Sequence, residues 1–230
     1  MKDLPSPEDY EKEMKYLPCG ATIKHVIEVV CAEAHKCAQV ADLMCGTGYL
    51  LGRIRSQRPD LKLHGIDIDN SMIEYASANH PEIEFTLADV LDWDPERKYD
   101  IITCTGALHH LAYADQGPLI ERIPDMTKPE GIFILSDSYI SDYYSERERR
   151  LNSLELGCEY IKEAINNEAP AEVIRACIDI MYNDIMRFEY KTSKNNTYKY
   201  LARIFGKIDL HEVWPEKNDG FGDAYFICTE

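Results

Sequence analysis

Short apolar runs alternate with stretches of helical spacing through the first 140 residues, and this alternation restricts the fold more than any other feature. The strand-like runs cover residues 40–43, 61–68, 82–90, 99–105 and 131–137. A capping box formed by Ser71 and Glu74 predicts the start of one intervening helix. Segments that alternate in this way form parallel strands joined by right-handed helical crossovers. We therefore predict an α/β fold in three layers, with helices on both faces of a mainly parallel sheet.

The pattern changes after residue 140. Residues 141–192 contain no strand-like run, and their apolar spacing predicts two amphipathic helices separated by Pro170. A helix and two strand-like runs that are close enough to pair antiparallel follow at the end of the chain. The sequence thus predicts a single domain over 1–230. We divide it into a helical segment 1–37, a core 38–140, a helical insertion 141–192, and a final helix with two strands in 193–230.

Composition excludes several classes of protein. The 25 Lys and Arg residues against 41 Asp and Glu residues give a net charge of −16, which disfavours nucleic acid as a partner. The eight cysteines are scattered without zinc-ligand spacing, so we predict no metal site and reduced thiols in the cytoplasm. Apolar runs all fall short of the ~20 residues of a membrane span, so we expect no membrane partner. The sequence leaves a homodimer open.

A glycine turn follows the first strand-like run. Gly46 and Gly48 let the backbone approach a ligand closely, and Asp67 ends the next strand about twenty residues later, where its carboxylate can accept hydrogen bonds from a ribose. Together they predict a nucleoside site. Leu51 stands where a dinucleotide-binding motif needs its third glycine, which makes a nicotinamide cofactor the weaker interpretation.

Five short motifs between residues 40 and 137 occur in a recognisable order. They are DLMCGTG, GIDIDNSM, TLADV, TCTGALHHL and TKPEG. In these motifs the chain resembles the class I S-adenosylmethionine-dependent methyltransferases. The resemblance implies a Rossmann-like, seven-stranded sheet whose last strand is antiparallel, S-adenosyl-L-methionine as cofactor, and methyl transfer to a small-molecule acceptor.

The resemblance also implies roles for individual residues. The backbone from Cys45 to Gly48 would hold the methionine part of the cofactor, Asp67 its ribose, and Asp89 its adenine amino group. The implied cofactor site consists of Asp42, Cys45, Gly46, Gly48, Asp67, Ile68, Met72, Asp89, Val90, Thr105 and Gly106. Two positions depart from the family pattern. Met44 and Glu130 stand where the family has glycine, so their backbones cannot adopt positive φ cheaply.

Three residues near the ends of the fourth and fifth strands are candidates for catalysis. His109 has the chemistry of a general base, and Asp137 and Tyr139 follow the fifth strand. We expect His110 to be a scaffold residue and the insertion to form a lid. Tyr10 and Tyr16 either fold over the cofactor or anchor the N-terminal segment. Two alternatives remain: a carboxy-S-adenosylmethionine synthase-like or tRNA-modification enzyme, and a non-catalytic S-adenosylmethionine-binding or assembly protein.

Overall fold

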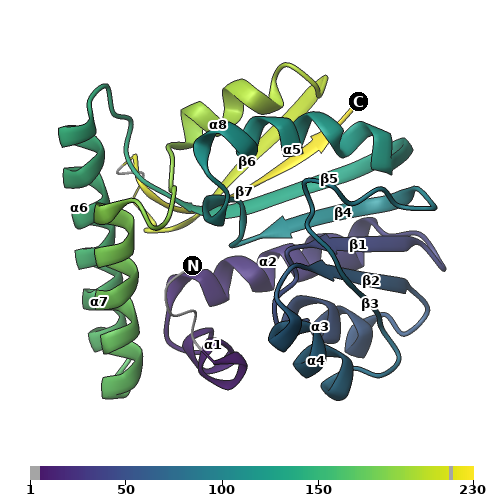
Figure 1. Cartoon of the computed structure of the whole chain (residues 1–230), viewed down its shortest axis with the longest axis horizontal. Helices are drawn as coiled ribbons and strands as arrows, with labels where there is room; N and C mark the ends of the chain where they lie inside the picture. The colour runs from purple at the N-terminus through teal and green to yellow at the C-terminus, as the bar shows by residue number, and fades with distance from the viewer. Residues whose placement is uncertain (1–5, 218–219) are drawn as a thin grey trace.

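A single twisted sheet organises the chain. The computed structural model describes residues 6–217 and 220–230. Its strands are β1 (Gln39–Leu43), β2 (Lys62–Asp67), β3 (Glu84–Leu87), β4 (Tyr99–Thr105), β5 (Thr127–Tyr139), β6 (Lys207–Trp214) and β7 (Gly222–Thr229). Among the described residues they form one seven-stranded sheet in the order β3-β2-β1-β4-β5-β7-β6 (Figure 1). Strands β1 to β5 pair in parallel, whereas β7 is antiparallel to both of its neighbours, β5 and β6. The predicted fold class is therefore confirmed.

Helices cover both faces of the sheet, which completes the three layers (Figure 1). The bounds are α1 (Pro7–Glu13), α2 (Pro18–Glu33), α3 (Tyr49–Gln57), α4 (Asn70–Asn79), α5 (Tyr113–Met126), α6 (Glu146–Asn166), α7 (Ala171–Met186) and α8 (Lys194–Leu201). One apolar core joins the sheet to α5 and α8, and the other joins it to α2 and α3. The central strands are apolar on both sides because both of their faces are covered.

Helices α6 and α7 form a hairpin that stands beside the sheet rather than on it (Figure 1). The guanidinium of Arg149, which is buried, donates to the carbonyl oxygens of Asp184 (2.7 Å) and Ile185 (3.0 Å) at the end of α7. Gly157 on α6 brings the two helices close together, since a Cβ there would lie 2.3 Å from the side chain of Met181. The hairpin is therefore a firmly packed unit.

A short segment after α7, residues 187–193, returns the chain to the sheet, and we call it the strap. The backbone N–H of Tyr190 donates to the carbonyl of His109 (2.7 Å), and that of Ile140 donates to the carbonyl of Thr192 (3.1 Å). Gln116 of α5 also donates to the carbonyl of Tyr190 (2.9 Å). The insertion is thus anchored to the sheet at its C-terminal end.

Local details differ from the sequence expectations in two places. The cap of α4 is Asp69, whose side chain accepts from the backbone N–H groups of Ser71 and Met72, so Ser71 is not the cap residue. An aspartate placed two residues earlier captures the free N–H groups first. Helix α2 begins at Pro18, earlier than its apolar spacing indicated, because proline is favoured in the first turn. Among the described helices, none is both long and apolar enough to cross a bilayer.

Candidate active site

A cavity of about 720 Å³ opens at the carboxyl ends of β1, β2, β4 and β5. In an open α/β sheet this edge is where ligands bind, because loops and helix N-termini converge there. Helix α1 and helix α7 close the cavity on the side away from the sheet. Their ends are joined by an ion pair between Lys12 and Glu172, both of which are partly exposed.

The glycine turn and Asp67 form the floor of one half of the cavity. Asp67 is 8% exposed, and its carboxylate accepts from the backbone N–H of Gly46 (2.7 Å) and of Asp69 (2.9 Å). Gly46 has a φ of +51°, and a Cβ added to it would meet no atom within 4 Å, so its open side faces the cavity. The carboxylate is therefore held in a fixed orientation while still reaching a ligand.

Met44 adopts the left-handed conformation that its position demands. Its φ is +59°, and Glu130, the other residue at a family glycine position, has a φ of +61°. Such backbone costs about 1–2 kcal/mol for a residue with a Cβ. The sequence analysis expected positive φ to be costly at Met44, and the structure places Met44 in this conformation all the same. The fold keeps the turn geometry and accepts the strain, and the side chain of Met44 occupies part of the cavity wall.

A half-open apolar surface lies next to Asp67. Ile68 is 54% exposed although it borders the cavity, and the buried side chain of Met72 lies beside it on the same wall. Asp89 and Val90 complete this half, with Asp89 oriented by the backbone N–H of Leu91 (2.9 Å). A flat apolar group flanked by a hydrogen-bond acceptor, such as a purine, fits this arrangement.

Thr105 and Gly106 line the junction between the two halves of the cavity. The Thr105 hydroxyl is buried and has no hydrogen-bond partner among the described residues. Gly106 has a φ of +61°, and a Cβ there would again meet nothing within 4 Å. A buried hydroxyl without a partner costs free energy, which indicates that a ligand completes this part of the site.

His109 lies between two carboxylates. Its Nδ1 donates to Asp137 (2.5 Å), its backbone N–H donates to the same carboxylate (3.1 Å), and its Nε2 lies 3.0 Å from Glu189 of the strap. His110 Nδ1 lies 3.4 Å from the same Glu189 oxygen. Glu189 is 80 residues away in sequence, so the local motif could not predict it.

The ionisation of this cluster bears on the expected role of His109 as a base. Burial alone would lower the pKa of His109, but the charge of Asp137 and the hydrogen bonds to Asp137 and Glu189 outweigh it and raise the pKa to about 9. Burial also opposes the ionisation of both carboxylates, yet their pKa values are lowered, by the charge of His109 at Asp137 and by its hydrogen bond at Glu189. His109 is thus a cation at neutral pH, with no free lone pair to accept a proton.

The same cluster is the one group of ligand-type side chains close enough to hold a metal among the residues described. The candidate atoms of His109, His110 and Glu189 all lie within 4.8 Å of one another. The sequence predicts no metal, and here both ring nitrogens of His109 already have carboxylate partners. We interpret the group as an ion-pair network.

Four predicted site residues lie outside the cavity lining. Asp42 is enclosed inside β1, where it accepts from the Thr103 hydroxyl (2.7 Å) and burial raises its pKa to about 7. Cys45 turns its side chain into the core, and Gly48 lies against the ring of Phe85, so only the backbone of this turn can serve a ligand. Tyr139 is the fourth.

Tyr139 is a core residue, which corrects its assignment as a catalytic candidate. It is buried, and its ring packs edge-on against Phe226, with 5.9 Å between the ring centroids. The reason is the length of β5, which pairs with β7 as far as Tyr139 and Gly222. We expected the strand to end at Asp137, and two further paired residues keep Tyr139 within the sheet. Tyr16 likewise packs in a core, whereas Tyr10 lines the cavity.

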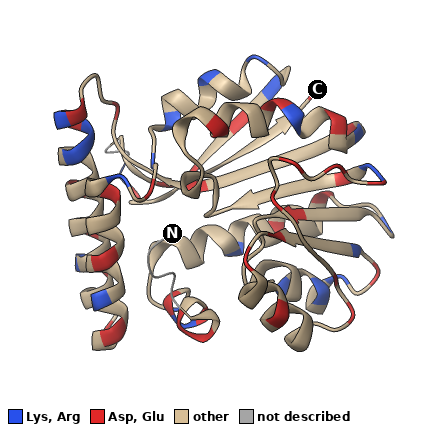
Figure 2. Ribbon diagram, in the orientation of Figure 1, with Lys and Arg blue, Asp and Glu red and all other residues tan. Residues whose placement is uncertain are grey.

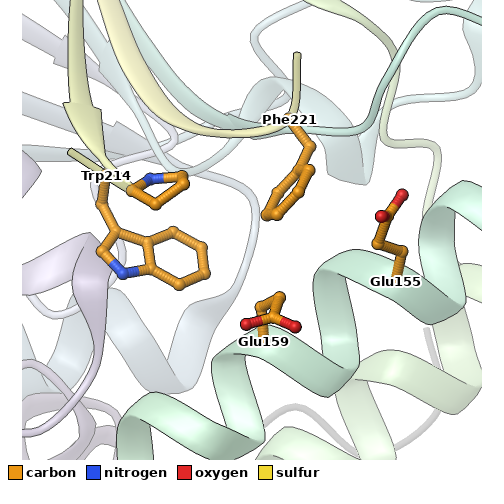
Figure 3. Close-up of a pocket in the computed structure, with 5 residues that line it drawn as sticks. Glu155, Glu159, Trp214 and Phe221 are labelled. Atoms are coloured by element: carbon orange, nitrogen blue, oxygen red, sulfur yellow. The ribbon is translucent and has the colours of Figure 1, made fainter. Parts of the chain in front are cut away.

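A second, smaller cavity of about 410 Å³ lies between α6 and the β6–β7 turn. Figure 3 shows Glu155, Glu159, Trp214 and Phe221 surrounding its opening. Glu159 pairs with Lys162 on the surface of α6. The first cavity, and not this one, lies at the carboxyl ends of the parallel strands, so the first cavity is the candidate active site.

The sheet order, with an antiparallel last strand and a glycine turn after the first strand, is that of the Rossmann-like fold found in class I methyltransferases. Residues 40–131 match the family described as "Methyltransferase domain". The chain is 35% identical over 91 residues to a trans-aconitate 2-methyltransferase of Methylobacterium radiotolerans, covering 40% of this chain and 34% of that protein. It is 25% identical over 166 residues to a malonyl-[acyl-carrier protein] O-methyltransferase of Acetivibrio thermocellus, covering 70% and 57%. The matches thus span about a third to somewhat over half of these relatives.

Solved structures extend the likeness of fold over most of the chain. The plantazolicin methyltransferase BpumL aligns with a TM-score of 0.63 at 14% identity, covering 93% of this chain and 85% of that one. The N-methyltransferase NodS of Bradyrhizobium japonicum, solved with S-adenosyl-L-homocysteine, aligns with a TM-score of 0.59 at 12% identity, covering 91% and 86%. Residues 40–131 are thus similar to a methyltransferase domain, and the chain has the fold of these solved methyltransferases.

Proposed function

We propose that this protein transfers a methyl group from S-adenosyl-L-methionine to a small-molecule acceptor. The observation that carries the proposal is the oriented carboxylate of Asp67, held by the backbone N–H groups of Gly46 and Asp69 at the edge of the cavity. A carboxylate placed in this way after the second strand is suited to the two hydroxyls of a ribose.

The remaining residues of this half of the cavity fit the same cofactor. Ile68 and Met72 offer an apolar face to an adenine ring, and Asp89 an acceptor for its amino group. The partnerless Thr105 hydroxyl and the open side of Gly106 leave room for the sulfur end. When bound, the cofactor supplies a methyl group on a positively charged sulfur, which is already activated for displacement.

The protein's own contribution is to position the reactants and to exclude water. An in-line displacement on an activated carbon gains most from proximity and alignment. Asp137 and Glu189 fix the His109 ring as a cation at the inner end of the cavity. This ring can donate a hydrogen bond or hold the wall in place, and proton removal falls to another group.

The test is isothermal titration of the wild-type protein with S-adenosylmethionine and S-adenosylhomocysteine, alongside Asp67→Asn and Asp67→Ala. Loss of a hydrogen bond to a charged group costs about 1.5–3 kcal/mol, so we expect each variant to bind at least tenfold more weakly. Asn has nearly the size of Asp, but its amide nitrogen would face one of the two backbone N–H groups, so the melting temperatures of both variants are compared with the wild type to separate lost contacts from distortion. Asp94→Ala, on an exposed side chain outside the cavity, is the matched control. Absence of binding by the wild type would refute the proposal.

The two alternative functions have less support. A carboxy-S-adenosylmethionine synthase needs an available cation for the extra carboxylate, and the buried cation of this cavity, Lys191, is already paired with Asp184. A non-catalytic role would require the side chain of Met44 to close the cofactor pocket. This side chain lines the cavity without closing it. We place the activity in the cytoplasm, because the eight free cysteines suit a reducing compartment.

A further inference from the structure

The charge of the cavity is strongly negative. Asp and Glu residues outnumber Lys and Arg residues eleven to three among the residues that line it. Figure 2 shows acidic and basic residues distributed over the helices and loops of the fold. A cavity lined by charges of one sign raises the local concentration of ligands of the opposite sign.

The three basic side chains are either neutralised or remote. Lys12 pairs with Glu172 at the outer edge of the cavity, and Arg175 is exposed. Lys191 is buried, and both oxygens of Asp184 accept from its ammonium group at 2.9 Å. His109 is held between Asp137 and Glu189. An acceptor that carries a carboxylate would therefore find no unpaired buried cation among the described residues of the cavity.

Glu13, by contrast, is a buried anion without a partner. It lies at the end of α1, is 5% exposed, and borders the cavity. Its carboxylate has neither a hydrogen bond nor an ion pair with any described residue. Burial and the nearby charge of Asp9 raise its pKa to about 7. Isolated carboxylates are costly to bury, so a partner supplied by a ligand would relieve this cost.

Asp223 adds a second carboxylate to the cavity. It is buried at the start of β7, and the Tyr160 hydroxyl donates to it at 2.5 and 2.6 Å. Hydroxyl groups are its nearest donors, and burial raises its pKa to about 6. Asp223, like Glu13, borders the cavity.

The walls of the cavity near Glu13 are apolar. Leu17, which directly precedes α2, and Val173 and Cys177 from α7 form a buried cluster here, and all three border the cavity. A positively charged group attached to an apolar body matches a buried carboxylate beside such walls. This region adjoins the half of the cavity that we assign to the cofactor and is separate from Asp67 and Asp89.

We infer that the methyl acceptor is a protonated amine on an apolar body, held by Glu13 in the part of the cavity between α1, the start of α2 and α7. The inference rests on the proposed function and specifies its substrate class. It also separates this chain from the curated relatives reported above, whose names specify trans-aconitate and a malonyl group on carrier protein, both of which carry carboxylates.

The test uses benzylamine, benzyl alcohol and benzoate as probes of similar shape and different charge. Their binding to the full chain is measured at neutral pH by ligand-observed NMR titration. We expect benzylamine to bind at least tenfold more tightly than benzoate, with benzyl alcohol between them. Glu13→Gln should weaken benzylamine at least fivefold and leave benzyl alcohol unchanged. Glu11→Gln, on the same helix but outside the cavity lining, is the matched control and should change nothing.

Three results would overturn the inference. Benzoate could bind as tightly as benzylamine, or Glu13→Gln could leave all three probes unaffected. The third is weaker benzylamine binding in the double variant Glu155→Gln, Glu159→Gln, which would locate the probe in the second cavity beside Trp214 (Figure 3). Because Glu13 has no partner, its replacement by Gln should not lower the melting temperature, which verifies that the variant folds.

Titration with S-adenosylhomocysteine separates this inference from the proposed function. Wild type and Glu13→Gln should bind it equally. A wild type that fails to bind it refutes the proposed function, whereas the probe series still decides the charge preference. Loss of S-adenosylhomocysteine binding in Glu13→Gln, with benzylamine binding intact, would assign Glu13 to the cofactor and overturn the inference.

Discussion

Glu130 offers a direct measurement of backbone strain, because its side chain has no other structural role. It is exposed, has a φ of +61°, and makes no hydrogen bond or ion pair with the residues described. Left-handed backbone costs a residue with a Cβ about 1–2 kcal/mol. Glycine removes that cost but loses about 0.5–1 kcal/mol through the greater entropy of its unfolded chain. Glu130→Gly should therefore stabilise the protein by about 0.5–1 kcal/mol.

The assay is thermal unfolding followed by circular dichroism. In a chain of this size 1 kcal/mol shifts the melting temperature by about 2–4 °C, so we expect a rise of about 1–4 °C. Glu130→Asn should show part of the gain, because asparagine tolerates the left-handed region, and Glu130→Ala should show none. Glu121→Gly, in the interior of α5 where φ is helical, should be destabilising by about 1 kcal/mol. Equal melting temperatures for the Gly and Ala variants at position 130 would refute the argument from strain.

Three further predictions concern the charges around the cavity. Lys191→Met should cost about 3–5 kcal/mol in urea unfolding, since it leaves the buried Asp184 uncompensated, and a loss below 1 kcal/mol would contradict this. The folded-state pKa of Glu13, about 7, exceeds its ordinary 4.5, so the folded protein binds the extra proton. The stability that protonated Glu13 contributes is lost as pH rises from 4.5 to 7. Glu13→Gln should therefore flatten the decline in melting temperature over that window. EDTA should leave the melting temperature unchanged; a fall that zinc restores would show that His109, His110 and Glu189 bind a metal.

The sheet and the cofactor half of the cavity could be predicted because their signals are local. Alternating apolar segments determine the strands, and Gly46 and Asp67 each follow a strand directly, so the topology brings them together. Asp42 could not be separated from them by spacing alone. Asp42 is buried beside Thr103 because it lies inside β1 and not after the strand.

The other half of the cavity depends on contacts between distant segments. His109 suggests a base when only its neighbours in sequence are known, and Glu189 of the strap changes it into a cation. Glu13 resembles the other acidic residues of a charged N-terminal helix, and its isolation appears only when α7 covers it. The position of Tyr139 inside the sheet could be predicted only from the length of the β5–β7 pairing. Tertiary packing, rather than local sequence, decides each of these residues.

The strap has a consequence for modular exchange between proteins of this fold. Residues 187–193 end the insertion, yet Tyr190 binds the backbone of His109 and Glu189 sets the charge of its ring. In a chimera that received residues 141–192 from another protein, both the side chain next to His109 and the α7 wall of the cavity would change. Grafting this insertion would therefore alter reactivity and acceptor preference together, and a graft meant to change only the acceptor would have to retain the native strap.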